Sequence, residues 1–185
     1  MIYFVTSNKG KFAEAREIFE DLVQKNIGYP ELQANTLEEV VAFGLVDVTA
    51  RLKVPVIIED AGLFIEGLKG FPGVYSAYVQ KTLGNPGILK LMEGVEDRRA
   101  YFASIVGYAE PGMEPVTFRG EVWGTIGFEA RGDMGFGYDP IFYLGDKSLA
   151  QVETEEKNKI SHRGRSMRAL KEWLDNRHSQ AGPTT

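Results

Sequence analysis

A pair of strand-like segments, 101–109 and 116–127, constrains the fold of this chain more than any other feature. Only residues 110–115 separate them, and this connection contains two prolines and a glycine, which favour a turn. Along the second segment Val116, Phe118 and Val122 alternate with polar residues, as expected for a strand with one buried face. Two strands joined by so short a turn pair antiparallel. We therefore do not expect a purely parallel sheet.

Helical and strand-like segments precede and follow this hairpin. Residues 2–5 and 54–58 are apolar runs typical of short buried strands. Apolar residues recur at helical spacing over 12–23 and again over 37–52. The other expected elements are a loop over 67–75, a short helix over 86–92, a strand over 141–144 and a C-terminal helix. We therefore expect an α/β fold in which helices flank a mixed β-sheet.

Length and composition limit what kind of protein this is. With 185 residues, 43% of them apolar, the chain fits one domain over 1–178 with a flexible tail over 179–185. A net charge of -5 argues against a nucleic-acid binder, which needs an extended basic face. The chain contains no cysteine, which excludes disulfides and thiolate metal sites. No apolar run approaches the length of a membrane span, so we expect a cytoplasmic protein without a membrane partner.

Two polar segments in the first third of the chain are candidate binding sites. Residues 6–11 lie between a strand and a helix, where free backbone N–H groups bind phosphate, although their spacing is not that of a Walker A loop. A solvated capping loop with surface lysines explains the same residues. Glu59 and Asp60 come at the expected end of an apolar strand, and burying two adjacent acids is costly unless a cation neutralises them. A surface turn explains this pair equally well.

Two further candidates lie near the C-terminus. Residues 135–140 combine glycines, which let a ligand approach the backbone, with Phe136, which can stack on a base; a glycine-rich turn with core aromatics is the alternative. Residues 157–168 form a basic patch, and Ser161 within it is expected to cap the start of a helix. Cations at a helix start are unfavourable unless an anion or a base edge lies beside them. A solvated basic face is the alternative there. Together, the four segments supply what a magnesium-bound nucleoside triphosphate requires.

These segments resemble the inosine triphosphate pyrophosphatase family, which hydrolyses non-standard purine nucleoside triphosphates. The matching motifs occur in the family's order and span nearly the whole chain. They are Thr6-Ser7-Asn8 with Lys11, Glu59-Asp60-Ala61-Gly62-Leu63, Pro72-Gly73-Val74-Tyr75-Ser76, Phe136-Gly137-Tyr138-Asp139-Pro140, and Glu156-Lys157-Asn158 with Ser161-His162-Arg163. The resemblance implies an elongated, two-lobed single domain with a central cleft, a homodimer, and Mg²⁺ as cofactor.

The resemblance also implies roles for the matching residues. Asp60 would activate the water that attacks the α-phosphorus, and Glu59 and Asp60 would bind the metal. His162 or Arg163 would donate to the 6-keto oxygen and so reject adenine, which carries an amino group there. The expected substrate-binding residues are Thr6, Ser7, Asn8, Lys11 and Ala61 together with Phe136, Gly137, Tyr138, Asp139, Lys157, Ser161, His162 and Arg163.

Several positions depart from the family's pattern. Asn35 stands where relatives often carry a metal-binding glutamate, and Glu38 or Glu39 is a nearby substitute. The phosphate-binding lysines of some relatives are absent, because Phe43-Gly44 and Ala77 occupy those regions. Two other functions stay open: a Maf-like pyrophosphatase acting on other nucleotides, and a nucleotide-binding module without catalysis.

Overall fold

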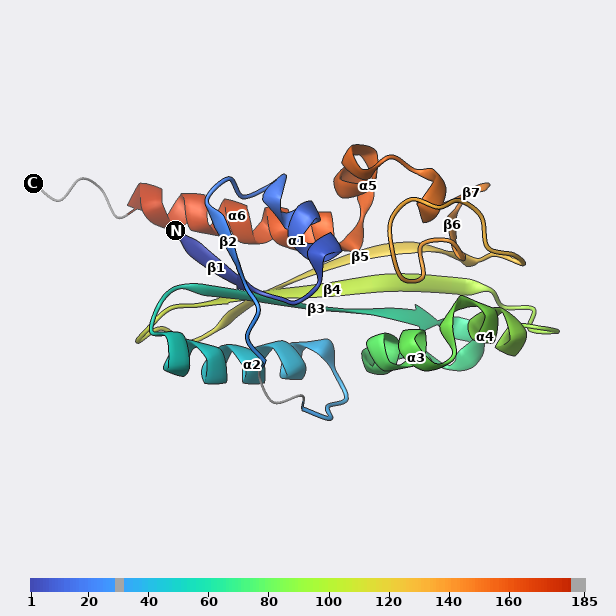
Figure 1. The fold of residues 1–185 in the computed structure, drawn as a ribbon, viewed down its shortest axis with the longest axis horizontal. Helices are drawn as coiled ribbons and strands as arrows, with labels where there is room; N and C mark the ends of the chain where they lie inside the picture. The colour runs from blue at the N-terminus through green and yellow to red at the C-terminus, as the bar shows by residue number, and fades with distance from the viewer. Residues whose placement is uncertain (29–31, 181–185) are drawn as a thin grey trace, which may run out of the picture.

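The computed structural model describes residues 1–28 and 32–180, and within these residues one seven-stranded sheet forms the centre of the molecule (Figure 1). Its order is β2-β1-β3-β4-β5-β6-β7. The strands are β1 (Ile2–Val5), β2 (Leu22–Lys25), β3 (Val56–Ile65), β4 (Arg99–Ala109), β5 (Val116–Ile126), β6 (Phe142–Leu144) and β7 (Lys147–Ser148). β1 runs parallel to β2 and β3, whereas the pairs from β3 to β7 are antiparallel. The predicted mixed sheet, with its β4–β5 hairpin, is confirmed.

Helices cover both faces of this sheet. Figure 1 shows α1 and α6 on one face, and α2, α3 and α4 on the other. The helices are α1 (Lys9–Arg16), α2 (Leu37–Leu52), α3 (Ser76–Thr82), α4 (Gly84–Leu91), α5 (Thr154–Ile160) and α6 (His162–Gln180), with short 3₁₀ turns at η1 (Glu66–Leu68), η2 (Gly73–Tyr75) and η3 (Leu149–Gln151). Nowhere in the described part of the chain is a helix long and apolar enough to cross a membrane.

Buried apolar side chains gather at both ends of the long strands. At one end, α2 packs Val41 and Leu45 against one face of β3 and β4, and α6 packs Met167 and Leu170 against the other. At the opposite end, a separate cluster joins α3 and α4 to β6, with Phe142 fully buried in it. The fold is therefore the two-lobed α/β domain that the sequence predicted.

Three predicted boundaries are wrong. The helix expected over 12–23 ends at Arg16, and Leu22–Lys25 forms β2, because the backbone there pairs with β1 (Ile2 opposite Leu22). Backbone pairing with a distant strand overrides local periodicity at this point. The C-terminal helix extends to Gln180, so the predicted flexible tail over 179–185 begins inside it, and residues 181–185 lie outside the described residues.

The third wrong boundary concerns the acidic pair. β3 does not end at Glu59 and Asp60 but continues to Ile65, because β4 pairs with it along its whole length. Successive residues of a strand point to opposite faces of the sheet. The two carboxylates are therefore separated by the sheet instead of projecting together from a strand end.

Candidate active site

A pocket of about 370 Å³ lies between the N-terminal ends of α1 and α6, the middle of β3, and α3. It collects most of the residues that the sequence predicted to bind substrate. The predicted residues that line it are Asn8, Lys11, Asp60, Ala61, Phe136, Gly137, Tyr138, Asp139, Lys157, His162 and Arg163. Thr6, Ser7 and Ser161 are not among its lining residues. Segments separated by up to about 150 residues thus meet at one place, as the resemblance implied.

The turn before α1 explains the position of the predicted phosphate cradle. Asn8 caps the helix, since its Oδ1 accepts a hydrogen bond from the backbone N–H of Lys11 at 3.1 Å. Thr6 Oγ1 in turn accepts from the N–H of Asn8 at 3.1 Å, while Ser7 is exposed. Thr6 therefore shapes the turn from outside the pocket, whereas Asn8 and Lys11 reach the lining. The helix N-terminus that they form is a favourable place for an anion.

Glu59 lies on the α6 side of the sheet, inside a buried network of ion pairs. Lys11 Nζ is 2.8 Å from its Oε2, and Arg163 Nε is 3.1 Å from its Oε1. The hydroxyl of Ser104 also donates to Oε1 at 2.8 Å. Burial alone would raise the pKa of Glu59, but the charges of Arg163 and Lys11 outweigh it and lower the pKa to about 2. Glu59 is therefore ionised and neutralised by two protein cations.

Glu14 forms the other half of this network, and sequence reasoning missed it. Its carboxylate bridges Lys157 Nζ at 2.8 Å and Arg163 Nη1 at 2.5 Å, and Lys157 Nζ also lies 2.7 Å from Asp139 Oδ2. Burial would raise the pKa of Glu14, yet the charges of Arg163 and Lys157 lower it overall. The available signal was its helical position, because an acid beside Ala15 falls within the apolar stripe of α1 and must have buried partners.

Phe136 and Asp139 shape one end of the pocket. The Phe136 ring lies 4.9 Å from Lys157 Nζ and 5.4 Å from the guanidinium carbon of Arg163. The ring also lies against Gly10, where an added Cβ would come within 2.7 Å of it. Asp139 Oδ2 accepts the backbone N–H of Phe136 at 2.8 Å, which fixes the loop that carries the ring. The predicted stacking platform is thus held in place by glycine, carboxylate and cations.

His162 begins α6 at the same end of the pocket. Ser161 caps the helix as predicted, since its Oγ accepts the N–H of Gly164 at 3.0 Å. The buried imidazole stacks on Phe102 at 4.7 Å, and its Nδ1 has no hydrogen-bond partner among the described residues. Burial, followed by the nearby charge of Arg163, lowers the pKa of His162 well below its usual value. The ring is therefore neutral and offers hydrogen bonding to a ligand without adding charge.

Asp60 is the carboxylate of the acidic pair that reaches the pocket. It is partly exposed, and its Oδ1 accepts the neighbouring N–H of Ala61 at 2.9 Å. Within residues 1–28 and 32–180, no group of three or more His, Asp or Glu side chains is arranged to hold a metal ion. Mg²⁺ commonly takes one or two carboxylates plus substrate phosphates, so the Asp60 carboxylate at the pocket fits an ion that arrives with a triphosphate.

The other predicted metal ligands have different contacts. Asn35 is exposed, and its backbone N–H donates to Glu39 Oε2 at 3.1 Å. Glu39 also completes the capping box of α2, and Glu38 pairs with Arg119 at 2.7 Å. The metal-binding roles of Glu59 and Asn35 stay predictions, and these contacts favour Asp60 as the ligand.

α3 contributes lining residues that the sequence analysis did not select. They are Ala77, Gln80 and Lys81. Gln80 Nε2 and Asn85 Nδ2 both donate to the carbonyl oxygen of Gly137, at 3.1 and 3.0 Å. These two bonds tie α3 and α4 to the loop that carries Phe136, so both lobes help to form the pocket.

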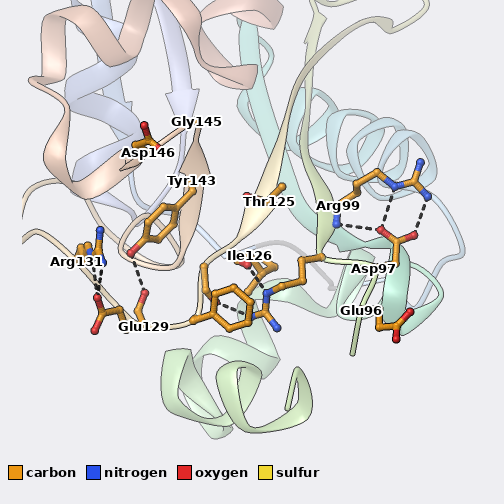
Figure 2. Close-up of a pocket in the computed structure, with 13 residues that line it drawn as sticks. Glu96, Asp97, Arg99, Thr125, Ile126, Glu129, Arg131, Tyr143, Gly145 and Asp146 are labelled. Atoms are coloured by element: carbon orange, nitrogen blue, oxygen red, sulfur yellow. Dashed lines mark hydrogen bonds and ion pairs between the residues drawn. The ribbon is translucent and has the colours of Figure 1, made fainter. Parts of the chain in front are cut away.

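A larger hollow of about 860 Å³ lies at the edge of the sheet near β6 and β7, away from these residues (Figure 2). Arg99 pairs with Asp97 at 2.7 Å and Arg131 pairs with Glu129 at 2.6 Å. Arg98 donates to the carbonyl oxygens of three residues. Because these cations already have partners and no predicted site residue lines the hollow, the smaller pocket is the candidate active site.

Comparisons with known proteins identify the family of this chain. A sequence model of the Ham1 family matches residues 2–173. A Methanosarcina mazei protein named dITP/XTP pyrophosphatase is 51% identical over 177 residues, which cover 94% of this chain and 96% of the relative. A dITP/XTP pyrophosphatase from Pyrococcus horikoshii is 51% identical over 179 residues, with 94% of this chain and 96% of the relative covered.

Solved structures of Ham1 proteins have the same fold as this chain. The structure of the Staphylococcus aureus Ham1 protein matches with a TM-score of 0.84 at 32% identity, covering 95% of this chain and 98% of that one. A Ham1 protein from Coxiella burnetii matches with a TM-score of 0.83 at 30% identity, over the same shares of the two chains. With sequence and fold in agreement over nearly its whole length, this chain belongs to the Ham1 family.

Proposed function

We propose that this protein hydrolyses non-standard purine nucleoside triphosphates, namely dITP, XTP and ITP, to the monophosphate and pyrophosphate. The observation that carries the proposal is the arrangement of the pocket. Asn8 and Lys11 from the start of α1 line it together with Asp60, and Phe136 and His162 add two aromatic rings to the lining. The names of the relatives that match 94% of the chain support the same substrates.

Asp60 has the position and the chemistry to direct the attacking water. It orients the water and accepts its proton as the new bond to the α-phosphorus forms. The bond between the α-phosphorus and its bridging oxygen breaks, and pyrophosphate leaves with that electron pair. Mg²⁺, held by Asp60 together with the substrate phosphates, would neutralise charge on the phosphate oxygens. Lys11 lies in the first turn of α1 and lines the pocket, where it would contact the triphosphate. Such a contact matters because phosphoryl transfer depends mainly on positioning and charge stabilisation.

Selectivity for the base follows from buried donors at the aromatic end. A purine stacked on Phe136 would direct its 6-position toward His162 and Arg163. A keto oxygen there accepts hydrogen bonds from them, whereas the amino group of adenine leaves buried donors without partners. Sites of this kind discriminate by as much as about 10⁴-fold.

We also propose that the protein acts as a homodimer in the cytoplasm, where the cellular nucleotide pool lies. Phe64 stacks on Tyr101 at 4.8 Å and Tyr101 contacts Trp123 at 4.5 Å across three strands, and Trp123 is still 53% exposed. Exposed apolar patches of this kind mark interaction surfaces. Sedimentation of the wild type and of Trp123→Glu tests the dimer. A monomeric wild type contradicts the proposal, whereas a dimeric wild type with a monomeric variant supports it.

Pyrophosphate release is the direct test of the catalytic proposal. The protein would be assayed with ITP, XTP and dITP beside ATP, GTP and CTP, with Mg²⁺ and with a chelator in its place. We expect release with the first three substrates, and only when Mg²⁺ is present. Release mainly from pyrimidine or standard nucleotides would favour a Maf-like enzyme, and binding without release would favour a nucleotide-binding module.

A further inference from the structure

The charges inside the pocket are already balanced by one another. Lys11 pairs with Glu59, and Arg163 bridges Glu59 and Glu14. Lys157 completes the set by pairing with Glu14 and with Asp139 at 2.7 Å. The carboxylates thus offset these cations one for one, and this leaves little positive charge to attract a triphosphate that carries several negative charges.

Lys81 is a pocket cation without such a partner. It lies in α3, lines the same pocket as Lys11 and Asp60, and has an exposed side chain. Over the described ranges, its ammonium group forms neither an ion pair nor a hydrogen bond with the protein. A lysine is a compact charge on a flexible stem, which suits phosphate oxygens whose position changes during a reaction.

Lys81 and Ala77 lie on the same face of α3. Ala77 lies four residues earlier in the same helix. Residues spaced by four lie on one face of a helix, so Lys81 projects beside Ala77, and both line the pocket. A charge moved by one turn stays within reach of the same space, because a helical turn rises only about 5.4 Å.

α3 is fixed firmly enough to present this charge to the site. Ser76 Oγ donates to the carbonyl oxygen of Gly73 at 2.6 Å and accepts the N–H of Leu63 in β3 at 2.8 Å. Tyr138 donates its hydroxyl to the carbonyl oxygen of Ser76 at 2.7 Å, and Gln80 binds Gly137. The helix is thereby tied both to the strand that carries Asp60 and to the loop that carries Phe136.

We propose that Lys81 binds the triphosphate of the substrate. The inference rests on the proposed function and adds a binding residue to it. Lys81 lines the pocket together with Lys11 and Asp60, and its charge acts on the phosphates and not on the base, which Phe136 and His162 would hold.

The test compares the wild type with Lys81→Ala, Lys81→Arg and the double variant Ala77→Lys/Lys81→Ala. Lys81→Ala should raise the KM for ITP roughly tenfold, the factor expected for one lost charge-assisted hydrogen bond, with a smaller change in kcat. Lys81→Arg should stay near the wild type, and the double variant should recover most of the affinity. Lys90→Ala is the matched control, since Lys90 is an exposed lysine of the next helix outside the pocket and should leave the KM unchanged.

Binding measurements separate a phosphate contact from other effects. Calorimetry with inorganic pyrophosphate and Mg²⁺ should show weaker binding to Lys81→Ala than to the wild type, whereas inosine, which has no phosphate, should bind both about equally. An unchanged KM in Lys81→Ala, or equal weakening for inosine and pyrophosphate, would overturn the assignment. If the wild type hydrolysed none of the triphosphates, the proposed function would fail, but the pyrophosphate titrations would still decide whether Lys81 binds phosphate.

Discussion

Replacing Glu14 with glutamine tests whether the buried ion network stabilises this fold. Glutamine keeps the shape of the side chain and removes its charge, so Lys157 and Arg163 each lose one of two carboxylate partners inside the protein. All three side chains are 4–5% exposed, so water cannot replace the lost contact. Removing one partner from a buried ion pair costs about 3–5 kcal/mol. Because Asp139 and Glu59 still face the two cations, we expect the lower end, about 3 kcal/mol.

The assay is urea unfolding followed by circular dichroism, with thermal unfolding beside it. A loss of about 3 kcal/mol corresponds to a decrease in Tm of roughly 6–12 °C for a chain of this size. Glu155→Gln is the matched control, because Glu155 pairs with Lys159 on the surface with side chains 82% and 68% exposed. Such exposed pairs contribute about 0–1 kcal/mol.

A double-mutant cycle identifies the source of the effect. Lys157→Met removes one of the cations that Glu14 neutralises, so Glu14→Gln should cost at least about 1 kcal/mol less in that background. The reasoning is refuted if Glu14→Gln costs no more than Glu155→Gln, or if the two buried substitutions are simply additive.

Three further predictions concern catalysis, pH and packing. Asp60→Asn should lose most turnover on ITP while nucleotide titration shows near-normal affinity; near-normal turnover would remove Asp60 from the mechanism. The lowered pKa values of Glu59, about 2, and of Glu14 mean that their stabilising contribution is complete above their ordinary pKa of 4.5 and is lost as the pH falls from there toward 2. Urea unfolding should therefore show a steep loss of stability across that window, and a shallower loss in Glu14→Gln. Gly120→Ala should destabilise the protein by at least about 2 kcal/mol, because the new Cβ would lie 2.1 Å from the carbonyl oxygen of His162; an unchanged Tm would contradict this.

Local sequence patterns were sufficient for the elements whose structure depends on their own residues. The helix predicted from Leu37 to about Leu52 is confirmed as α2, which has a regular apolar stripe and a capping box at Thr36. The β4–β5 hairpin and the Ser161 cap were also predicted correctly, because a short turn and a side-chain oxygen at a helix start act within a few residues.

The motif segments display the recurring chemistry of a nucleotide site directly in the sequence. In the structure, residues from these segments line one pocket. The resemblance to a family added the order of these segments along the chain. Geometry within the pocket was less predictable. Thr6 and Ser161 each cap a turn or helix next to the pocket, and their expected contact with substrate stays a prediction.

The sequence by itself determined the mixed sheet, the α2 helix, the hairpin and the set of chemical groups at the site, because these follow from spacing and side-chain chemistry. Only the tertiary structure decided that residues 22–25 form a strand, since this depends on pairing with β1. It also decided that Glu59 is neutralised by Lys11 while Asp60 reaches the pocket, because β4 extends β3 past both acids and the sheet separates them. Partners distant in sequence, such as Glu14 and Lys157, become neighbours only when helices pack, and no local pattern records that contact.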